Sequence, residues 1–225
     1  ALYLHGCGST PERTEPFATL PASEITTPLK PVQLPPSEFS AQFNQVEQAL
    51  QGFNWMAASH TLADIPTGLT RHIDQQYRNY LQARIHYLRG HPQEASSLLL
   101  AQESSIGPLD PAIRIKANNL QRYILSLSGK NLQSAFLGKQ MLNYTSSDDN
   151  TVSAMRRSIW SELQKVPAQD LQRALKEATE PRWQGWLSLS ALMSRQGPVD
   201  IQRELSRWRD ENPNHPVANP LPGGL

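Results

Sequence analysis

The chain has 225 residues, of which 38% are hydrophobic, and its formal net charge is +1. This near-neutral balance argues against a dedicated nucleic-acid-binding protein, because such a partner demands a strongly basic surface. No apolar run reaches the roughly 18 residues of a membrane-spanning helix. The single cysteine excludes an internal disulfide and a cysteine-rich metal site.

The first segment, "LYLHGCGST" at residues 2–10, contains the only cysteine. Residues 4–7, "LHGC", fit the bacterial lipobox, in which a small residue precedes the cysteine at the signal-peptidase cleavage point. The motif predicts that Cys7 becomes the lipidated first residue of the mature protein, and the alternative is an incidental terminal cysteine. Gly8 follows it instead of the Asp that retains lipoproteins at the inner membrane of enteric-type bacteria. We therefore expect a lipid-anchored protein on the periplasmic face of the outer membrane.

Residues 11–36 contain seven prolines and no helical period. Proline blocks helix and strand pairing, so we expect an extended, polyproline-like tether that completes a first region at residues 1–36. From Ser37 the pattern changes, and Phe39, Phe43 and Val46 begin a series of apolar residues spaced three or four apart. This spacing predicts an amphipathic helix with Ser37 as its N-cap.

The same periodicity continues to residue 212 and predicts one helical domain at residues 37–212. After the first helix we expect further helices at residues 54–64, 67–89, 91–102, 110–128, 130–144, 150–165, 168–178, 181–196 and 198–211. They form about five antiparallel pairs. Residues 213–225 contain four prolines and two glycines, which is typical of an exit linker.

Similar turns recur along this domain and indicate internal repeats. Three glycines follow a Leu-X pair at intervals of 38 and 39 residues: Gly52, Gly90 and Gly129. A small residue stands five positions after each of them: Ala57, Ala95 and Ser134. Glycine can end the first helix of a pair in the left-handed conformation, and the small residue lets the second helix cross closely. The period is that of helical-hairpin solenoids, so we predict an all-α, TPR-like solenoid. An irregular helical bundle is the alternative.

No catalytic constellation is evident in the sequence. The histidines do not form a metal-protease motif, and there is no serine-nucleophile elbow and no glycine-rich phosphate loop. We therefore expect a protein without enzymatic activity, metal or cofactor. Trp183 and Trp186 have the spacing to stack on a sugar ring, but we interpret them as packing near the end of the solenoid.

Basic residues recur on the first helices of the predicted pairs. If these helices line a concave surface, as in other stacked hairpins, their guanidinium groups form a mildly basic groove for an acidic peptide or an anionic polymer. The alternative is an ordinary solvated surface. The predicted groove residues are Arg71, Arg78, Arg114, Arg122 and Arg156.

The last quarter of the chain resembles the LpoA (LppC) family of outer-membrane lipoproteins, which activate class A penicillin-binding proteins. The lipobox, tether, helical pairs and exit segment also follow the order expected for that family. The residues that carry the resemblance are Gly185, Trp186, Leu187, Trp208, Pro213, Asn214, Pro216, Ala218, Leu221 and Pro222.

The resemblance implies a non-catalytic, TPR-like domain that supports regulation of peptidoglycan synthesis. In this family the linker leads to a second domain with the fold of periplasmic substrate-binding proteins, which contacts the penicillin-binding protein. That domain is absent from this sequence. The expected partners are a class A penicillin-binding protein, the outer membrane through the lipid anchor and, as a weaker expectation, peptidoglycan; no nucleic acid is expected. The alternative function is a TPR-like scaffold of another envelope assembly complex, and a wall-cleaving enzyme is a third, less favoured reading.

Overall fold

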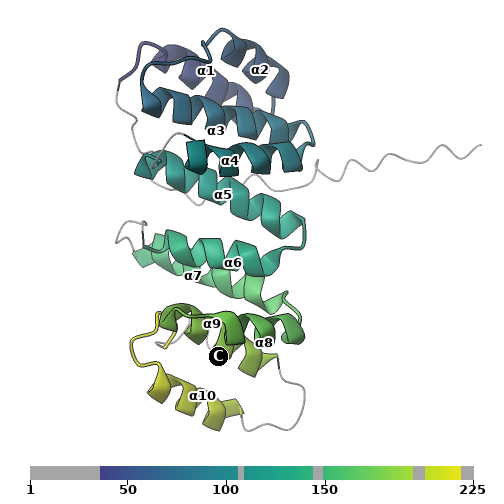
Figure 1. The fold of residues 1–225 in the computed structure, drawn as a ribbon, viewed down its shortest axis with the longest axis vertical. Helices are drawn as coiled ribbons and strands as arrows, with labels where there is room; N and C mark the ends of the chain where they lie inside the picture. The colour runs from purple at the N-terminus through teal and green to yellow at the C-terminus, as the bar shows by residue number, and fades with distance from the viewer. Residues whose placement is uncertain (1–35, 106–108, 144–148, 195–200, 219–225) are drawn as a thin grey trace, which may run out of the picture.

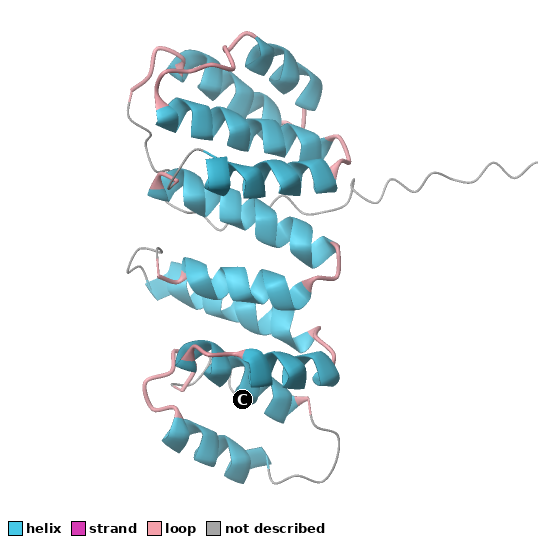
Figure 2. Cartoon of the chain, viewed as in Figure 1, coloured by secondary structure: helices cyan, strands magenta, loops and turns pink. Residues whose placement is uncertain are grey.

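The computed structural model describes residues 36–105, 109–143, 149–194 and 201–218. Within these ranges the chain consists of α-helices joined by turns and loops, without a strand (Figure 2). This result confirms the predicted all-α class. None of the helices in the described ranges is long and apolar enough to cross a membrane. The helices are α1 (Ser40–Gln51), α2 (Trp55–Ala63), α3 (His72–Leu88), α4 (Pro92–Ser105), α5 (Pro111–Leu127), α6 (Asn131–Met141), α7 (Asp149–Gln164), α8 (Ala168–Glu177), α9 (Pro181–Met193) and α10 (Ile201–Glu211).

The helices are stacked in layers along the long axis of the molecule, from α1 and α2 at one end to α10 at the other (Figure 1). In the first half α1 packs on α2, α3 on α4 and α5 on α6, while α3 also contacts both α1 and α5. This arrangement of successive hairpins confirms the predicted TPR-like solenoid.

The second half of the stack departs from the predicted pairing. There α7 packs mainly on α6, α8 packs on α9, and α10 packs on α9. The connection between α7 and α8 ends at Pro167, whose φ of −56° and ψ of 141° are extended. None of the described residues in this connection is left-handed, unlike the turns that end α1, α3 and α5.

The turns that end α3 and α5 have the same hydrogen-bond pattern. Gly90 and Gly129 have φ values of +82° and +71°, which confirms the left-handed conformation predicted for both. In the first turn, the amide of Gly90 donates to the carbonyl of Tyr87, and the next amide, of His91, donates to His86. This pattern is a Schellman motif, which satisfies carbonyls that the helix end leaves without partners.

The turn that ends α1 has this motif shifted by one residue. Gly52 has a φ of −82°, and Phe53 is the left-handed residue, with a φ of +56°. The buried small residue shifts with it: Ala58 is fully buried, whereas the predicted Ala57 is exposed. The spacing of five residues between the left-handed position and the small residue is therefore kept, but the prediction for Gly52 is wrong.

Two helix starts also differ from the sequence prediction. α3 begins at His72 rather than near residue 67, because Gly68 and Thr70 have low helix propensity and follow a proline. Ser37 is not the N-cap of α1, which is Phe39. The Ser37 hydroxyl instead accepts a hydrogen bond from the amide of Phe39 and donates one to Asp74 on α3.

The buried apolar side chains form two clusters. The first extends from Phe43 to Ile124 and lies within α1–α5. The second extends from Ala135 to Val217 and is built by α6–α10 and the segment after α10. Between the two clusters, the contact of α5 with α6 and α7 includes buried polar side chains such as Arg122 and Glu162.

Residues 213–218, the described part of the segment for which we expected an exit linker, pack on the helical stack. His215 and Val217 are buried, with 6% and 5% of their surface exposed, and the segment packs against α9 and α10. Trp183 and Trp186 belong to the same cluster, so their predicted packing role is confirmed. The segment packs there because His215 contacts Trp186 on α9 and Trp208 on α10.

Candidate functional site

Three of the five predicted groove arginines donate hydrogen bonds to backbone carbonyls in non-helical segments of the chain. The pairs are Arg71 Nη1 to Pro36 O at 2.6 Å, Arg78 Nε to Ile65 O at 3.1 Å and Arg114 Nη2 to Leu109 O at 3.1 Å. A charged donor on a loop carbonyl stabilises that connection. Through these hydrogen bonds, the three side chains connect α3, α5 and the residue before α3 to non-helical segments.

Arg122 is buried, with 8% of its surface exposed. Its guanidinium donates to Ser134 O at 3.1 Å and to Ser158 Oγ at 2.9 Å, and contacts Met155 Sδ at 2.8 Å. Gly138 on α6 makes room for it, because a Cβ at that position would lie 2.7 Å from Arg122 Cζ. Arg122 therefore joins α5, α6 and α7 and does not line an open groove, which corrects the sequence interpretation of this residue.

Arg156 on α7 is partly exposed. Its Nε atom is buried and has no hydrogen-bond partner in the structure. The predicted arginines thus differ in environment along the stack, and they do not present a uniform basic stripe. Cys7, the predicted lipidation site, lies outside the described residues.

A cluster of charged and aromatic side chains joins α1, α3 and α5, and we call it the Glu47 cluster. Glu47 on α1 forms ion pairs with Arg84 and, at 2.9 Å, with Lys116. The hydroxyl of Tyr77 donates to Glu47 Oε1 at 2.6 Å. Lys116 Nζ lies 5.3 Å from the ring centre of Tyr77 and 5.7 Å from that of Tyr80, within range of cation–π attraction.

The electrostatics of this cluster favour the ionised carboxylate. Burial alone would raise the pKa of Glu47, but Arg84, Lys116 and the Tyr77 hydroxyl lower it to about 2. Burial, with the nearby carboxylate, raises the pKa of Tyr77, and burial raises the pKa of Tyr80 to about 12. The cluster therefore holds one negative and two positive charges at neutral pH.

The sequence prediction did not include Glu47 or Arg84. The available signal was the spacing of Tyr77, Tyr80 and Arg84, which places them on one side of α3. The groove prediction for this helix considered Arg78 and did not include Arg84. A pairing across 37 residues with a carboxylate on another helix has no local signature.

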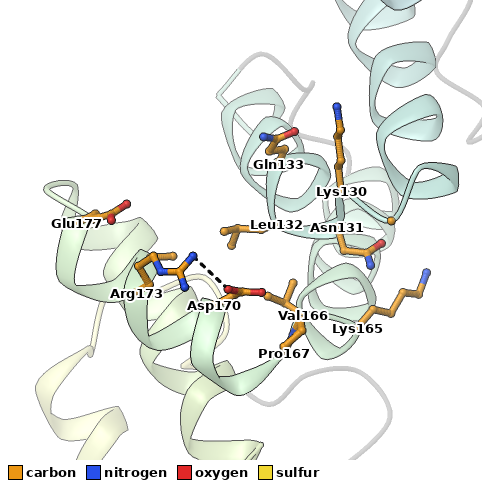
Figure 3. A pocket seen from close by; sticks show the side chains of 12 residues that line it. Lys130, Asn131, Leu132, Gln133, Lys165, Val166, Pro167, Asp170, Arg173 and Glu177 are labelled. Atoms are coloured by element: carbon orange, nitrogen blue, oxygen red, sulfur yellow. Dashed lines mark ion pairs between the residues drawn. The ribbon is translucent and has the colours of Figure 1, made fainter. Parts of the chain in front are cut away.

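An open pocket of about 340 Å³ lies between the turn that precedes α6, the turn that precedes α8, and one side of α8 (Figure 3). Lys130 and Lys165 stand at its exposed edge, and Asp170 and Arg173 form an ion pair at 3.4 Å on its wall. The lining residues are Gly129, Lys130, Asn131, Leu132, Gln133, Lys165, Val166, Pro167, Asp170, Arg173, Ala174 and Glu177.

This lining contains charged and amide groups but no serine, cysteine or histidine that could act as a nucleophile or base. Within the described residues, no group of three or more His, Cys, Asp and Glu side chains could hold a metal ion. The fold places the chain in a class of protein, the helical-hairpin solenoids.

Comparison with known proteins gives the family. The family model of the LppC lipoproteins matches residues 44–225, and the chain belongs to this family. The penicillin-binding protein activator LpoA of Aliivibrio fischeri is 24% identical over 110 residues, which are 48% of this chain and 18% of that relative. The chain thus spans only a small part of the length of the curated relative it matches. No solved structure matches the chain.

Proposed function

We propose that this chain is the helical, non-catalytic part of an outer-membrane lipoprotein that supports peptidoglycan synthesis by activating a class A penicillin-binding protein. The observation that carries the proposal is the family match over residues 44–225, together with a relative named as an activator of a penicillin-binding protein. The hairpin stack is consistent with a binding role, because repeated helices offer extended surfaces for partners.

The direct test measures glycan-strand polymerisation by a purified class A penicillin-binding protein, with and without a full-length lipoprotein that contains this chain. We expect the full-length protein to raise the rate, and we expect residues 36–218 alone to give little activation. The reason is the family resemblance, in which a second domain contacts the enzyme. No change of rate with the full-length protein would contradict the proposal.

The anchor in this proposal is a lipid on Cys7. Each buried methylene contributes about 0.8 kcal/mol to membrane binding, so several acyl chains together hold a protein firmly. We expect Cys7→Ala to move the protein from the outer-membrane fraction to the soluble periplasmic fraction, and Ser9→Ala to leave it in the membrane. Detergent partitioning of the two variants is the measurement. A Cys7→Ala protein that stays with the membrane would show that the cysteine is not the anchor.

Peptidoglycan is a second proposed partner, held by weak contacts with its peptide carboxylates. The groups available are the partly exposed Arg78, Arg114 and Arg156, and the lysines at the edge of the pocket in Figure 3. Exposed charges of this kind contribute about 0–1 kcal/mol each and are screened by salt. We expect muropeptide-induced NMR shifts at these residues that shrink at high ionic strength. Shifts elsewhere, or shifts insensitive to salt, would remove this partner.

The alternative function is a TPR-like scaffold for another envelope assembly complex. It is favoured by the low identity and partial coverage of the match to the activator. Capture with the tagged, lipidated full-length protein separates the two functions. Recovery of a penicillin-binding protein supports activation, whereas reproducible recovery of a different envelope complex supports the scaffold.

A further inference from the structure

The segment that follows α10 turns back and packs on α9, and we call residues 212–218 the C-terminal clasp. The imidazole of His215 lies between two indole rings, with centre-to-centre distances of 5.3 Å to Trp186 and 5.1 Å to Trp208. Gly185 allows this approach, because a Cβ there would lie 2.5 Å from Cδ2 of His215. His215 therefore packs the clasp against α9 and α10.

The hydrogen bonds of His215 specify one neutral tautomer. The backbone amide of Val217 donates to Nδ1 at 3.3 Å, so Nδ1 is an acceptor and has no proton. Nε2 lies 2.9 Å from the carbonyl oxygen of Arg182, so Nε2 has the proton and donates it. A second proton on Nδ1 would face the Val217 amide and replace a hydrogen bond with two opposed donors in a buried site.

The charges near the ring also oppose protonation. Burial, with Arg182 on α9 and Arg156 on α7, lowers the pKa of His215, while the hydrogen bond to the Arg182 carbonyl opposes this change. From α10 the residue that contacts the imidazole is Trp208, which has no charge. The site therefore favours neutral imidazole through its hydrogen bonds, its burial and its charged neighbours.

We propose that the C-terminal clasp is a proton-operated latch, which is docked on α9 while His215 is neutral and is released when Nδ1 takes up a proton. Release uncovers the faces of Trp186 and Trp208 that the imidazole contacts. The latch thus makes access to an aromatic surface depend on pH.

The test is an NMR titration of residues 36–225 between about pH 8 and about pH 5, the range over which histidine changes charge. Three signals report the latch: the His215 Cε1–H, the Val217 amide, and the Trp208 indole N–H, which donates to Ser188 Oγ. We expect His215 to titrate below its ordinary value of 6.5. We also expect the other two signals to change with the same midpoint as the clasp leaves α9.

Three variants separate this latch from a general effect of acid. His215→Gln is neutral at every pH, so the Trp208 signal should no longer respond, while the exposed control His72→Gln should behave as wild type. Gly185→Ala excludes the ring and should show the released signals even at high pH. A His215 that titrates at or above 6.5, or Val217 and Trp208 signals that stay constant while it titrates, would overturn the proposal.

Discussion

Phe53 occupies a backbone conformation that ordinary side chains avoid. Its φ is +56°, and the left-handed region costs a residue with a Cβ about 1 kcal/mol or more. The residue is 55% exposed, so little packing offsets this strain. We expect Phe53→Gly to raise the free energy of unfolding by about 0.5–1 kcal/mol, after allowance for the greater entropy of glycine in the unfolded chain. Urea denaturation measures the change.

The matched control keeps the Cβ and removes the ring. Phe53→Ala should therefore stay close to wild type, and an equal gain from both variants would show that the strain is not the cause.

The reciprocal change is Gly90→Ala, which places a Cβ at a φ of +82° and should lower the free energy of unfolding by about 1 kcal/mol. Gly68→Ala is its control, because both positions are open and the φ of Gly68 is not left-handed.

Among the elements, α1, α3 and α5 are joined by the Glu47 cluster, and this contact is sensitive to acid. The pKa of Glu47 falls from 4.5 to about 2 on folding, so the folded state binds the proton less tightly than the unfolded state. The resulting stabilisation is present above about pH 4.5 and is lost as the pH falls towards about 2, with an upper limit of roughly 3 kcal/mol.

We expect Glu47→Gln to flatten this part of the stability curve. Urea denaturation at several pH values between about 5 and about 2.5 would show it as a smaller loss of stability on acidification than in wild type. Glu38 lies on the segment just before α1 and takes part in no ion pair among those of the described residues, so Glu38→Gln is the control. If both variants lose stability with the wild-type slope, the Glu47 cluster does not carry the acid sensitivity.

The positions of these elements were largely predictable, and their contacts were not. Apolar spacing and glycine turns located the helices because both are local properties of the chain. The left-handed conformation of Phe53 was not predicted, because Gly52, one position earlier, is an equally plausible residue for that conformation. Arg122 was misinterpreted because its burial depends on Gly138 of the next helix, and the C-terminal clasp was missed because proline content alone does not reveal aromatic partners on α9.

At the scale of the whole molecule, the two apolar clusters meet across a polar contact. Arg122 donates to α6 and α7, and Ser126 on α5 donates to Glu162 on α7 at 3.0 Å. Stability in stacked hairpins is close to a sum of local terms and interactions between neighbours. Ile115 of α5 packs on the second cluster, but the side chains buried between the two clusters include Arg122 and Glu162, and we therefore expect the two halves to lose structure separately.

Leu81 and Leu163 provide a matched pair to test this expectation, since each is fully buried in one cluster. Replacing either with Ala should destabilise its own half by about 2–5 kcal/mol, through lost burial and the cavity left behind. In native-state hydrogen exchange, Leu163→Ala should therefore lower the protection of amides in α7–α9 and leave α3 protected, and Leu81→Ala should do the reverse. Equal loss of protection along the whole stack in both variants would mean that the Arg122 contact couples the halves into one cooperative unit. In that case, adding Arg122→Ala to either leucine variant should confine the loss of hydrogen-exchange protection to the half that contains the replaced leucine.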